Sequence, residues 1–344
     1  MELNMLLNTS PEFEMAAYTL CALTGGECEF NVNGDDVNLV AKTIKVNDEI
    51  MIDDCHPYVA GAITHRPKPG TGSTKKPKPS DEKFQTLVDR MRAADVDRAG
   101  PGDYKLDFGN KVSGTSDNSD NDLFVYVNET LFQRPVYANL LALLKRKIFL
   151  NDVCEKEAPM SGLRKTQIQL LLDTWTNTEV FRLAFDYMHA KGEKHATTFE
   201  AFKKFLFNFW FGTYSRCNGP VGSSGFEHVF TGEWKKGTVG GHHSWVTYYE
   251  AQKAGKINYH GYYSTVSDLA GTFQYRWQRV FKKTGGFLFG TSPAFDFSLF
   301  TVCSLMYPGK GGCHYSIDGY SLGVTSFTQP CSAGLCLATA YPTN

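Results

Sequence analysis

The order of the periodic patterns along the chain predicts an α+β fold. An N-terminal helical part is expected first, followed by two small lobes of mixed or antiparallel sheet that form an active-site cleft. Apolar residues recur at helical spacing between residues 81 and 211, whereas short aromatic-rich runs alternate with turn residues beyond Gly225. Helices that precede the strands, rather than alternating with them, are typical of the α+β class.

Four helical segments are predicted before residue 212. They begin at Asp81 and cover, after that first helix, about 136–150, 164–190 and 198–211. The last segment opens with Thr197 and Glu200, the spacing of a capping box. Beyond Gly225, a short amphipathic helix is expected just after His243, with Gly255 as its stop.

Size and composition indicate a globular protein. A chain of 344 residues, 42% hydrophobic and 14% aromatic, can form one large domain with an appendage or two ordinary domains. No apolar run reaches the roughly 18 residues that a membrane span needs, and residues 1–4 do not resemble a signal peptide. We expect no membrane span and a monomer.

The formal charge of −1 conceals an uneven distribution. Residues 1–62 hold eleven acidic residues and two lysines, a charge of −9, so the remainder carries +8. Within 225–310, nine basic residues face five acidic ones. This basic excess suits a polyanionic substrate.

Nine cysteines leave at least one unpaired within the chain. Cys331 and Cys336 are placed to close a small loop, and two Asn-x-Thr/Ser sites begin at Asn8 and Asn128. These features slightly favour secretion, but buried cysteines in a cytoplasmic protein explain them about as well.

The chain contains a broken internal repeat. Residues 8–21 match 290–303, and residues 28–34 match 313–319; each copy predicts a helix after Ser-Pro, then a strand and a glycine turn. We therefore expect three parts: a partial copy at 1–62, a linker rich in Pro, Lys and Gly at 63–79, and a complete domain at 80–344. The partial copy could pack as a half-lobe, pair with an upstream copy, be left partly unfolded, or cover the basic region as an acidic mimic of the substrate. The simplest interpretation is that the chain is a fragment of a longer tandem protein.

Two histidines carry the most specific signal. His228 lies in the segment Gly-Phe-Glu-His-Val-Phe-Thr-Gly-Glu and His243 in Gly-His-His-Ser-Trp. A pair of imidazoles can supply both the base and the acid of one displacement near neutral pH, which is what RNA cleavage through the 2′-hydroxyl requires. Structural zinc is not favoured, because no Cys-x-x-Cys occurs.

The segment from about residue 80 to 344 resembles the EndoU (XendoU-like) endoribonuclease family, which is poly(U)-specific and has a uridylate-specific cousin in nidoviruses. The matching motifs are AADVDR at 93–98, PGDY at 101–104, LFVYVNE at 123–129, FGTYSR at 211–216, GFEHVFTGE at 225–233, GHHSW at 241–245, FGTSPAF at 289–295 and ATAYP at 338–342.

The resemblance implies cleavage of single-stranded RNA at uridines, leaving 2′,3′-cyclic phosphate ends. It assigns His243 as the base, His228 as the acid and Lys282 as the cation beside the phosphorane, with Lys282 preferred to Lys283 by ungapped counting from Gly290. His242 does not fit the family's Gly-x-His-x-Trp pattern.

The resemblance also implies supporting residues. Glu227 and Glu233 match family carboxylates that orient the histidines or recruit a divalent ion, and a carboxylate beside His228 is expected to raise the pKa of that ring. Thr339 and Tyr341 match a strand that contacts the uracil. The family's frequent need for Mn²⁺, or Ca²⁺ in some members, implies such a cation here without identifying its ligands.

One position departs from the cousin's pattern. Gly286 stands where the nidoviral enzymes have a serine that helps to select the base, and Thr284 or Ser292 is a candidate substitute. The alternative function is a catalytically silent module that binds RNA or a protein on the same fold.

Overall fold

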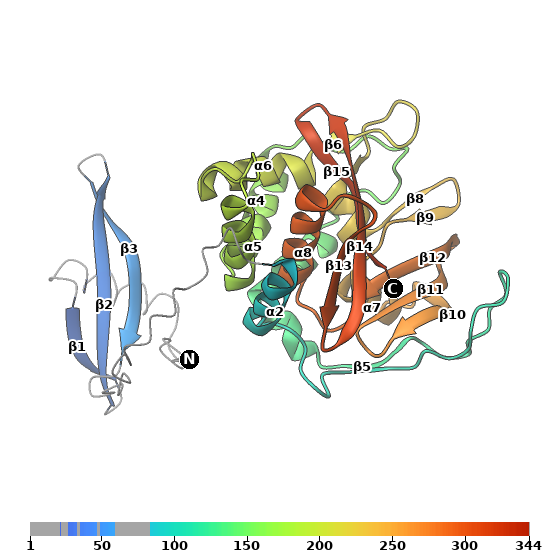
Figure 1. Ribbon diagram of the computed structural model, residues 1–344, viewed down its shortest axis with the longest axis horizontal. Coiled ribbons are helices and arrows are strands. Elements are labelled where there is room, and N and C mark those ends of the chain that lie inside the picture. The colour runs from blue at the N-terminus through green and yellow to red at the C-terminus, as the bar shows by residue number, and fades with distance from the viewer. Residues whose placement is uncertain (1–20, 22–26, 33–34, 47–48, 59–82, 344) are drawn as a thin grey trace. The chain divides into compact units, whose positions relative to one another are not determined.

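The computed structural model describes residues 21, 27–32, 35–46, 49–58 and 83–343 (Figure 1). The chain divides into two units, Met1–Lys75 and Lys76–Asn344. The division falls within the predicted linker at 63–79, which lies outside the described residues. The helix predicted within residues 8–21 also lies outside them, apart from Cys21.

The described part of the N-terminal unit is a three-stranded antiparallel sheet in the order β1-β2-β3. Its strands are β1 (Glu27–Val32), β2 (Asp35–Val46) and β3 (Glu49–Tyr58). Two residues separate each strand from the next. The register of β2 on β3 shifts after Lys42, the eighth residue of β2.

In the described part of the C-terminal unit, five α-helices precede residue 212 and two lie among later strands. Their bounds are α2 (Phe84–Ala94), α3 (Pro135–Lys145), α4 (Gly162–Thr176), α5 (Glu179–Ala190), α6 (Phe199–Phe211), α7 (Trp245–Lys253) and α8 (Pro293–Met306), with a 3-10 turn η2 at Glu129–Gln133. This mixture of helix and sheet agrees with the predicted α+β class.

Helix boundaries differ from the predictions in three places. The segment 164–190 is two helices, because α4 ends at Thr176 and the hydroxyl of Thr178 starts α5 by accepting from the N–H of Phe181. Likewise, α6 is capped by Thr198, which accepts from the N–H of Ala201, so the predicted capping box at Thr197 is wrong. In addition, α3 ends at Lys145, before the predicted residue 150.

The strands of this unit form two main sheets. One is mixed and five-stranded, in the order β10-β11-β12-β9-β8, and the other is antiparallel and three-stranded, in the order β13-β14-β15. Two short pairs, β4-β5 and β6-β7, complete the described sheets. The bounds are β4 (Tyr104–Leu106), β5 (Phe124–Val127), β6 (Thr213–Tyr214), β7 (Ser223–Ser224), β8 (Glu233–Lys235), β9 (Thr238–Gly240), β10 (Ile257–Val266), β11 (Ala270–Trp277), β12 (Val280–Leu288), β13 (Gly309–Ile317), β14 (Tyr320–Cys331) and β15 (Gly334–Thr343).

The sheet β13-β14-β15 repeats the plan of β1-β2-β3. Strands β2 and β14 each have twelve residues, and β3 and β15 each have ten. Two residues again separate successive strands, and the register of β14 on β15 shifts after Phe327, the eighth residue of β14. The two sheets thus share strand order, turn length and the position of one bulge.

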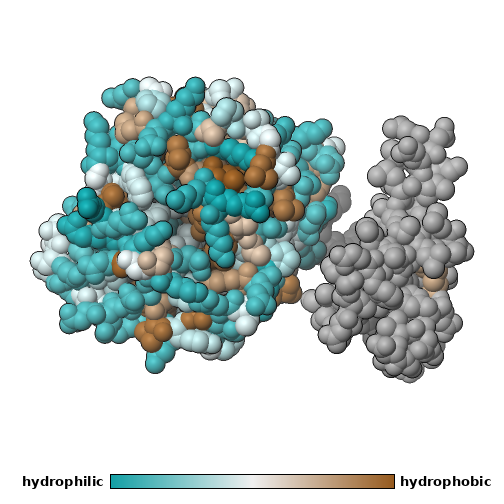
Figure 2. Space-filling model, turned by 180° about the vertical axis from the view of Figure 1, so that it is seen from behind, coloured by the Kyte–Doolittle hydropathy of each residue, from teal (hydrophilic) through white to brown (hydrophobic). Residues whose placement is uncertain are grey.

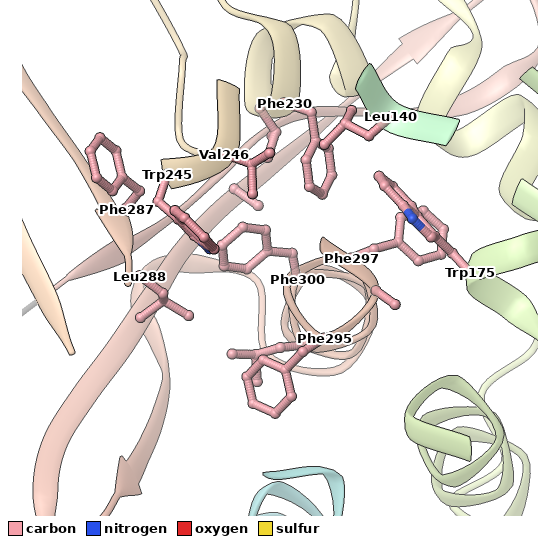
Figure 3. Packing of buried hydrophobic residues seen from close by; sticks show 14 of the residues in the cluster. Leu140, Trp175, Phe230, Trp245, Val246, Phe287, Leu288, Phe295, Phe297 and Phe300 are labelled. Carbon is pink, nitrogen blue, oxygen red and sulfur yellow. The ribbon is translucent and has the colours of Figure 1, made fainter. Parts of the chain in front are cut away.

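Helix α8 forms the centre of the C-terminal unit. It begins after Ser292, whose hydroxyl accepts from the N–H of Phe295, and its side chains are almost all buried. It contacts α2 to α5 and all three strands of the sheet β13-β14-β15, and it lies between them in Figure 1. Aromatic side chains of α8 meet those of neighbouring segments, such as Trp175 against Phe297 (Figure 3). This packing fixes the position of β15, which carries site residues.

The face of this unit seen in Figure 2 is mostly hydrophilic. Among the described residues, no helix combines the length and apolar character that crossing a membrane requires. The six cysteines between residues 83 and 343 form three disulfides, Cys154–Cys217, Cys303–Cys313 and Cys331–Cys336, and the last is the predicted small loop.

Candidate active site

His228 lies in a π-helical turn, η3 (Glu227–Thr231), that aromatic side chains hold in place. Phe226 directly before the turn and Phe230 within it are fully buried and stack on each other, with ring centroids 5.2 Å apart. Turns of this kind are rare and are found mostly at functional sites. The buried neighbours leave the His228 side chain 14% exposed, so a substrate can reach its ring.

His243 is brought beside this turn by a close contact between two backbone segments. Its N–H donates to the carbonyl of Val229 over 2.7 Å, and the N–H of His242 donates to the carbonyl of His228, also over 2.7 Å. Gly241 permits this approach, because its φ is +59° and a Cβ at this position would collide with the carbonyl oxygen of His228. The motif glycine is therefore a requirement of the histidine pairing.

The two imidazole rings have centroids 5.9 Å apart and are held by different partners. Nδ1 of His243 is 2.8 Å from the carbonyl oxygen of Gly286. Since a carbonyl can only accept, Nδ1 carries the proton, and Nε2 of the neutral ring is a lone-pair base. Nδ1 of His228 instead lies 2.7 Å from Oε1 of Glu233, a carboxylate that stabilises the protonated ring.

Lys282 approaches the pair from β12. Its side chain is buried, and its ammonium group donates to the carbonyl of Gly241 over 2.6 Å. Burial lowers the pKa of Lys282 to about 8, while the charge of Glu233 acts in the opposite direction. The neighbouring Lys283 is exposed, so of the two lysines the structure brings Lys282 to the histidines.

Burial dominates the titration of both histidines. It lowers the pKa of His228 to about 4, although the hydrogen bond and charge of Glu233 raise it. It lowers the pKa of His243 well below 6.5, assisted by the positive charge of Lys282. The expected upward shift for His228 is therefore wrong in its net direction, because desolvation outweighs the carboxylate. The carboxylate still favours protonation of His228 rather than of His243.

Arg216 is a site residue that the sequence reasoning missed. Its Nε lies 2.9 Å from Oε1 of Glu233, and its guanidinium also donates to the hydroxyl of Tyr214 and the carbonyl of Ala338. Arg216 thus fixes the carboxylate that holds His228 and ties it to β15. Its place in the motif 211–216 was the only signal in the sequence.

The described contacts of Glu227 do not include either ring of the histidine pair. Its Oε1 accepts from the hydroxyl of Ser224 over 2.8 Å, and the residue is fully buried. Burial, and then the nearby carboxylate of Glu157, raise the pKa of Glu227 well above its usual range. Arg164 pairs with Glu157. Glu227 therefore belongs to a buried polar cluster behind His228.

The residues predicted to contact uracil lie on β15. The ring of Tyr341 stacks on His243, with centroids 5.1 Å apart and an interplanar angle of 26°. Oγ1 of Thr339 is buried and has no hydrogen-bond partner in the described part of the chain.

The third predicted RNA-binding residue, Ser292, has a structural role. Its hydroxyl caps α8, and its backbone N–H donates to the carboxylate of Asp95. Its described contacts are with these groups and not with the histidine pair. Thr284, the other candidate substitute for a serine at 286, is exposed on β12.

His242 is buried on the opposite side of its segment. Its Nδ1 lies 2.9 Å from the hydroxyl of Tyr275, and its ring stacks on Trp277 with centroids 4.4 Å apart. Its backbone takes a φ of +64°. These contacts make His242 a core residue, in agreement with the family pattern.

The donor groups of the site do not fit a resident metal ion. Between residues 83 and 343, no group of three or more His, Cys, Asp and Glu side chains is placed to hold one. Glu233 is committed to His228 and Arg216, and Glu227 is separated from them within the buried cluster.

Comparison with known proteins places the chain in a family. Residues 83–342 match the family described as Endoribonuclease XendoU. The uridylate-specific endoribonuclease of Paralichthys olivaceus is 32% identical over 262 residues, which cover 72% of this chain and 66% of that protein. Uridylate-specific endoribonuclease D of Xenopus laevis is 34% identical over 259 residues, covering 70% of this chain and 83% of that protein.

A solved structure gives the same result. The structure of XendoU, a splicing-independent endoribonuclease that processes snoRNA, superposes with a TM-score of 0.62 at 28% identity and covers 75% of this chain and 96% of that chain. The family match over residues 83–342 contains both histidines and the lysine described above. The chain belongs to the XendoU endoribonuclease family.

Proposed function

We propose that this chain is an endoribonuclease that cleaves single-stranded RNA on the 3′ side of uridines and leaves 2′,3′-cyclic phosphate ends. One observation carries the proposal: two imidazoles with centroids 5.9 Å apart are held through Nδ1 by opposite kinds of partner, beside a buried ammonium group. This arrangement offers a base, an acid and a cation to one phosphodiester.

The chemistry follows from the partners of the two rings. Nε2 of His243 accepts the proton of the 2′-hydroxyl while the 2′-oxygen bonds to phosphorus. The bond from phosphorus to the 5′-oxygen breaks, and Nε2 of protonated His228 donates its proton to that oxygen. Lys282 stabilises the additional negative charge on the phosphorane.

Uracil recognition is proposed for Tyr341 and Thr339. Tyr341 offers a ring on which uracil can stack, next to the proton acceptor His243. Thr339 offers a hydroxyl without a hydrogen-bond partner among the described residues, on the same strand. A side chain at 286 is excluded by packing, because a Cβ there would lie 2.6 Å from the carbonyl oxygen of Gly271. We therefore assign selection of the nucleobase to the side chains of Thr339 and Tyr341 on β15.

Substitutions on β15 test this recognition. We expect Tyr341→Ala to lower kcat/KM for uridine RNA by about 5- to 150-fold, the value of about 1–3 kcal/mol for one stacked base. Tyr341→Phe keeps the ring and is the matched control. Thr339→Val removes the hydroxyl at constant shape and is expected to reduce the preference for uridine over cytidine. An unchanged uridine-to-cytidine ratio of kcat/KM in Thr339→Val would remove Thr339 from base reading.

The pKa values predict how cleavage depends on pH. Protonated His228 is required, and its pKa of about 4 in the free enzyme means that kcat/KM falls as the pH rises from 5 to 8. A further fall is expected above about 8, where Lys282 loses its charge. Glu233→Gln removes the carboxylate that raises the pKa of His228, so it shifts the first fall to lower pH. An unchanged profile in Glu233→Gln contradicts the assignment of His228 as the acid.

A divalent cation, with Mn²⁺ as the first candidate, is proposed to act through the RNA phosphates. The protein side of the site does not provide three ligands among the described residues. Such a cation would organise the flexible RNA rather than supply the acid or the base.

The deciding experiment incubates the full chain with a fluorescent uridine-containing RNA, with and without Mn²⁺. Cleavage at uridine with 2′,3′-cyclic phosphate ends supports the proposal. Retention of the RNA without cleavage in both conditions supports the binding module instead. The three disulfides of residues 83–343 suit an oxidising compartment, so secretion is proposed and the assay is run without reductant.

We also propose that residues 1–62 are a partial copy of the domain's C-terminal part and residues 63–79 a linker. The shared strand order, turn length and bulge of the two sheets support this. At the register positions of Thr339 and Tyr341, the partial copy has Asp54 and His56. The copy therefore lacks the residues proposed to read uracil, and cleavage is assigned to 80–344.

A further inference from the structure

We propose that the hollow beside the β8-β9 hairpin binds the nucleotide that follows the scissile phosphate, and that Lys235 and Lys236 hold the next phosphate of the RNA. The inference rests on the proposed function and extends it by a second subsite. Its ligand is a ribonucleotide with a phosphate on its 3′ side.

The hollow is of nucleotide size and opens on one catalytic residue only. Its volume is about 530 Å³, within the range of ordinary ligand pockets. Its lining includes His228 but none of His243, Lys282, Thr339 or Tyr341. The hollow is therefore separate from the surface proposed for uracil, and it adjoins the active site at His228, the proposed acid.

The direction of the RNA strand across the two histidines indicates which nucleotide occupies the hollow. Uracil on Tyr341 places the 2′-hydroxyl at His243, because the two rings are stacked. The departing 5′-oxygen must reach His228, and this oxygen belongs to the next nucleotide. Since His228 forms part of the wall of the hollow, that nucleotide enters it.

The charge of the hollow matches a phosphate. Arg216, Lys235 and Lys236 line it together with a single carboxylate, Glu233. Glu233 is 2% exposed and already paired with His228 and Arg216. Both lysines are exposed, and within residues 83–343 neither ammonium group takes part in a described ion pair or hydrogen bond. Two uncommitted cations therefore face the bound strand.

The turn between β8 and β9 places Lys236 at the lining of the hollow. Lys236 and Gly237 connect β8 to β9, with φ values of +49° and +79°. Turns with two positive φ values strongly favour Asn-Gly or Asp-Gly, and a long side chain at the first position is disfavoured.

The test compares two substrates in the full chain. The trinucleotide UpApA has the downstream nucleotide and phosphate, whereas uridine 3′-(4-nitrophenyl) phosphate has neither. We expect the double variant Lys235→Gln/Lys236→Gln to lower kcat/KM for UpApA about tenfold at low salt and to reduce the slope of its salt dependence by about one. Its kcat/KM for the aryl phosphate should not change.

Lys165→Gln/Lys194→Gln removes two exposed lysines elsewhere and serves as the matched control. An equal loss on both substrates, or no loss on UpApA, would overturn the subsite. If the wild type cleaves neither substrate, the proposed function fails, and the subsite is decided by binding. In that arm, the variant must bind a trinucleotide with 2′-deoxyuridine in place of uridine more weakly than the wild type, while its affinity for deoxyuridine 3′-phosphate stays the same. Equal binding of the trinucleotide overturns the inference.

Discussion

His243→Ala is expected to lower kcat for cleavage of uridine RNA by about 10²- to 10⁴-fold, the usual contribution of a general base or acid. His228→Ala should cause a loss of similar size on RNA, and Lys282→Ala about 10²- to 10³-fold, because each removes an interaction with the transition state. Single-turnover rates with a fluorescent uridine RNA measure these losses.

A change of leaving group separates the two histidines. Uridine 3′-(4-nitrophenyl) phosphate releases a stable phenolate that needs no proton, so His228→Ala should retain most of its activity on this substrate. His243→Ala should remain defective, because the 2′-hydroxyl must still lose its proton. The opposite pattern would exchange the roles of the two rings.

The control for both variants is His242→Asn. Asparagine tolerates the positive φ at this position, and the described contacts of His242 are with the core. We expect lower thermal stability with kcat within about threefold of the wild type, since the change leaves the acid, the base and the cation in place. If His242→Asn lost as much kcat as His243→Ala, activity would depend on the fold of residues 241–245 rather than on the imidazole of His243.

Arg164→Met is expected to lower the free energy of unfolding by about 3–5 kcal/mol, the cost of removing one partner of a buried ion pair. The guanidinium pairs with Glu157 and also donates to the carbonyl of Ala158. Its removal leaves the buried carboxylate of Glu157 unpaired next to Glu227, whose pKa burial has already raised. Urea denaturation measures the change.

The pH dependence of this deficit identifies its cause. The charge of Arg164 lowers the raised pKa of Glu227, so its removal raises that pKa further, and the folded variant takes up a proton as the pH falls toward the ordinary value of the carboxyl group. The stability deficit should therefore shrink between pH 7 and about 4.5. Lys165→Met, at an exposed neighbouring position, is the control and should leave stability nearly unchanged. A deficit that is independent of pH would attribute the effect to packing alone.

Local signals in the sequence predicted much of the fold and three of the side chains that the structure brings together in the candidate site. The class, the helix after Ser292-Pro293 and the helix that follows His243 depend on periodicity and caps within short windows, and the structure contains them. His228 and His243 lie within motifs, and counting residues back from Gly290 without a gap identified Lys282. Helix ends were less certain, because a break such as that at Thr178 interrupts an apolar pattern that continues on both sides.

Partners that are distant in sequence could not be predicted. The acceptor for His243 is a backbone carbonyl at Gly286, 43 residues away, and backbone groups leave no mark in a sequence. Arg216 reaches Glu233 only because β6 and β7 fold back beside η3. The net pKa of His228 depends on how much water its neighbours exclude, which no motif records.

The measurement that tests the central claim most directly is an NMR titration of the histidine ring protons with and without uridine 3′-phosphate. If both rings and the lysine surround one phosphate, its binding should raise the pKa of His228 above about 4 and raise that of His243 in the same titration, because an anion stabilises both protonated rings. The shift should be weaker at both rings in Lys282→Ala, which loses affinity for the phosphate. A shift confined to one histidine, or absent from both at saturating ligand, would contradict a shared phosphodiester site.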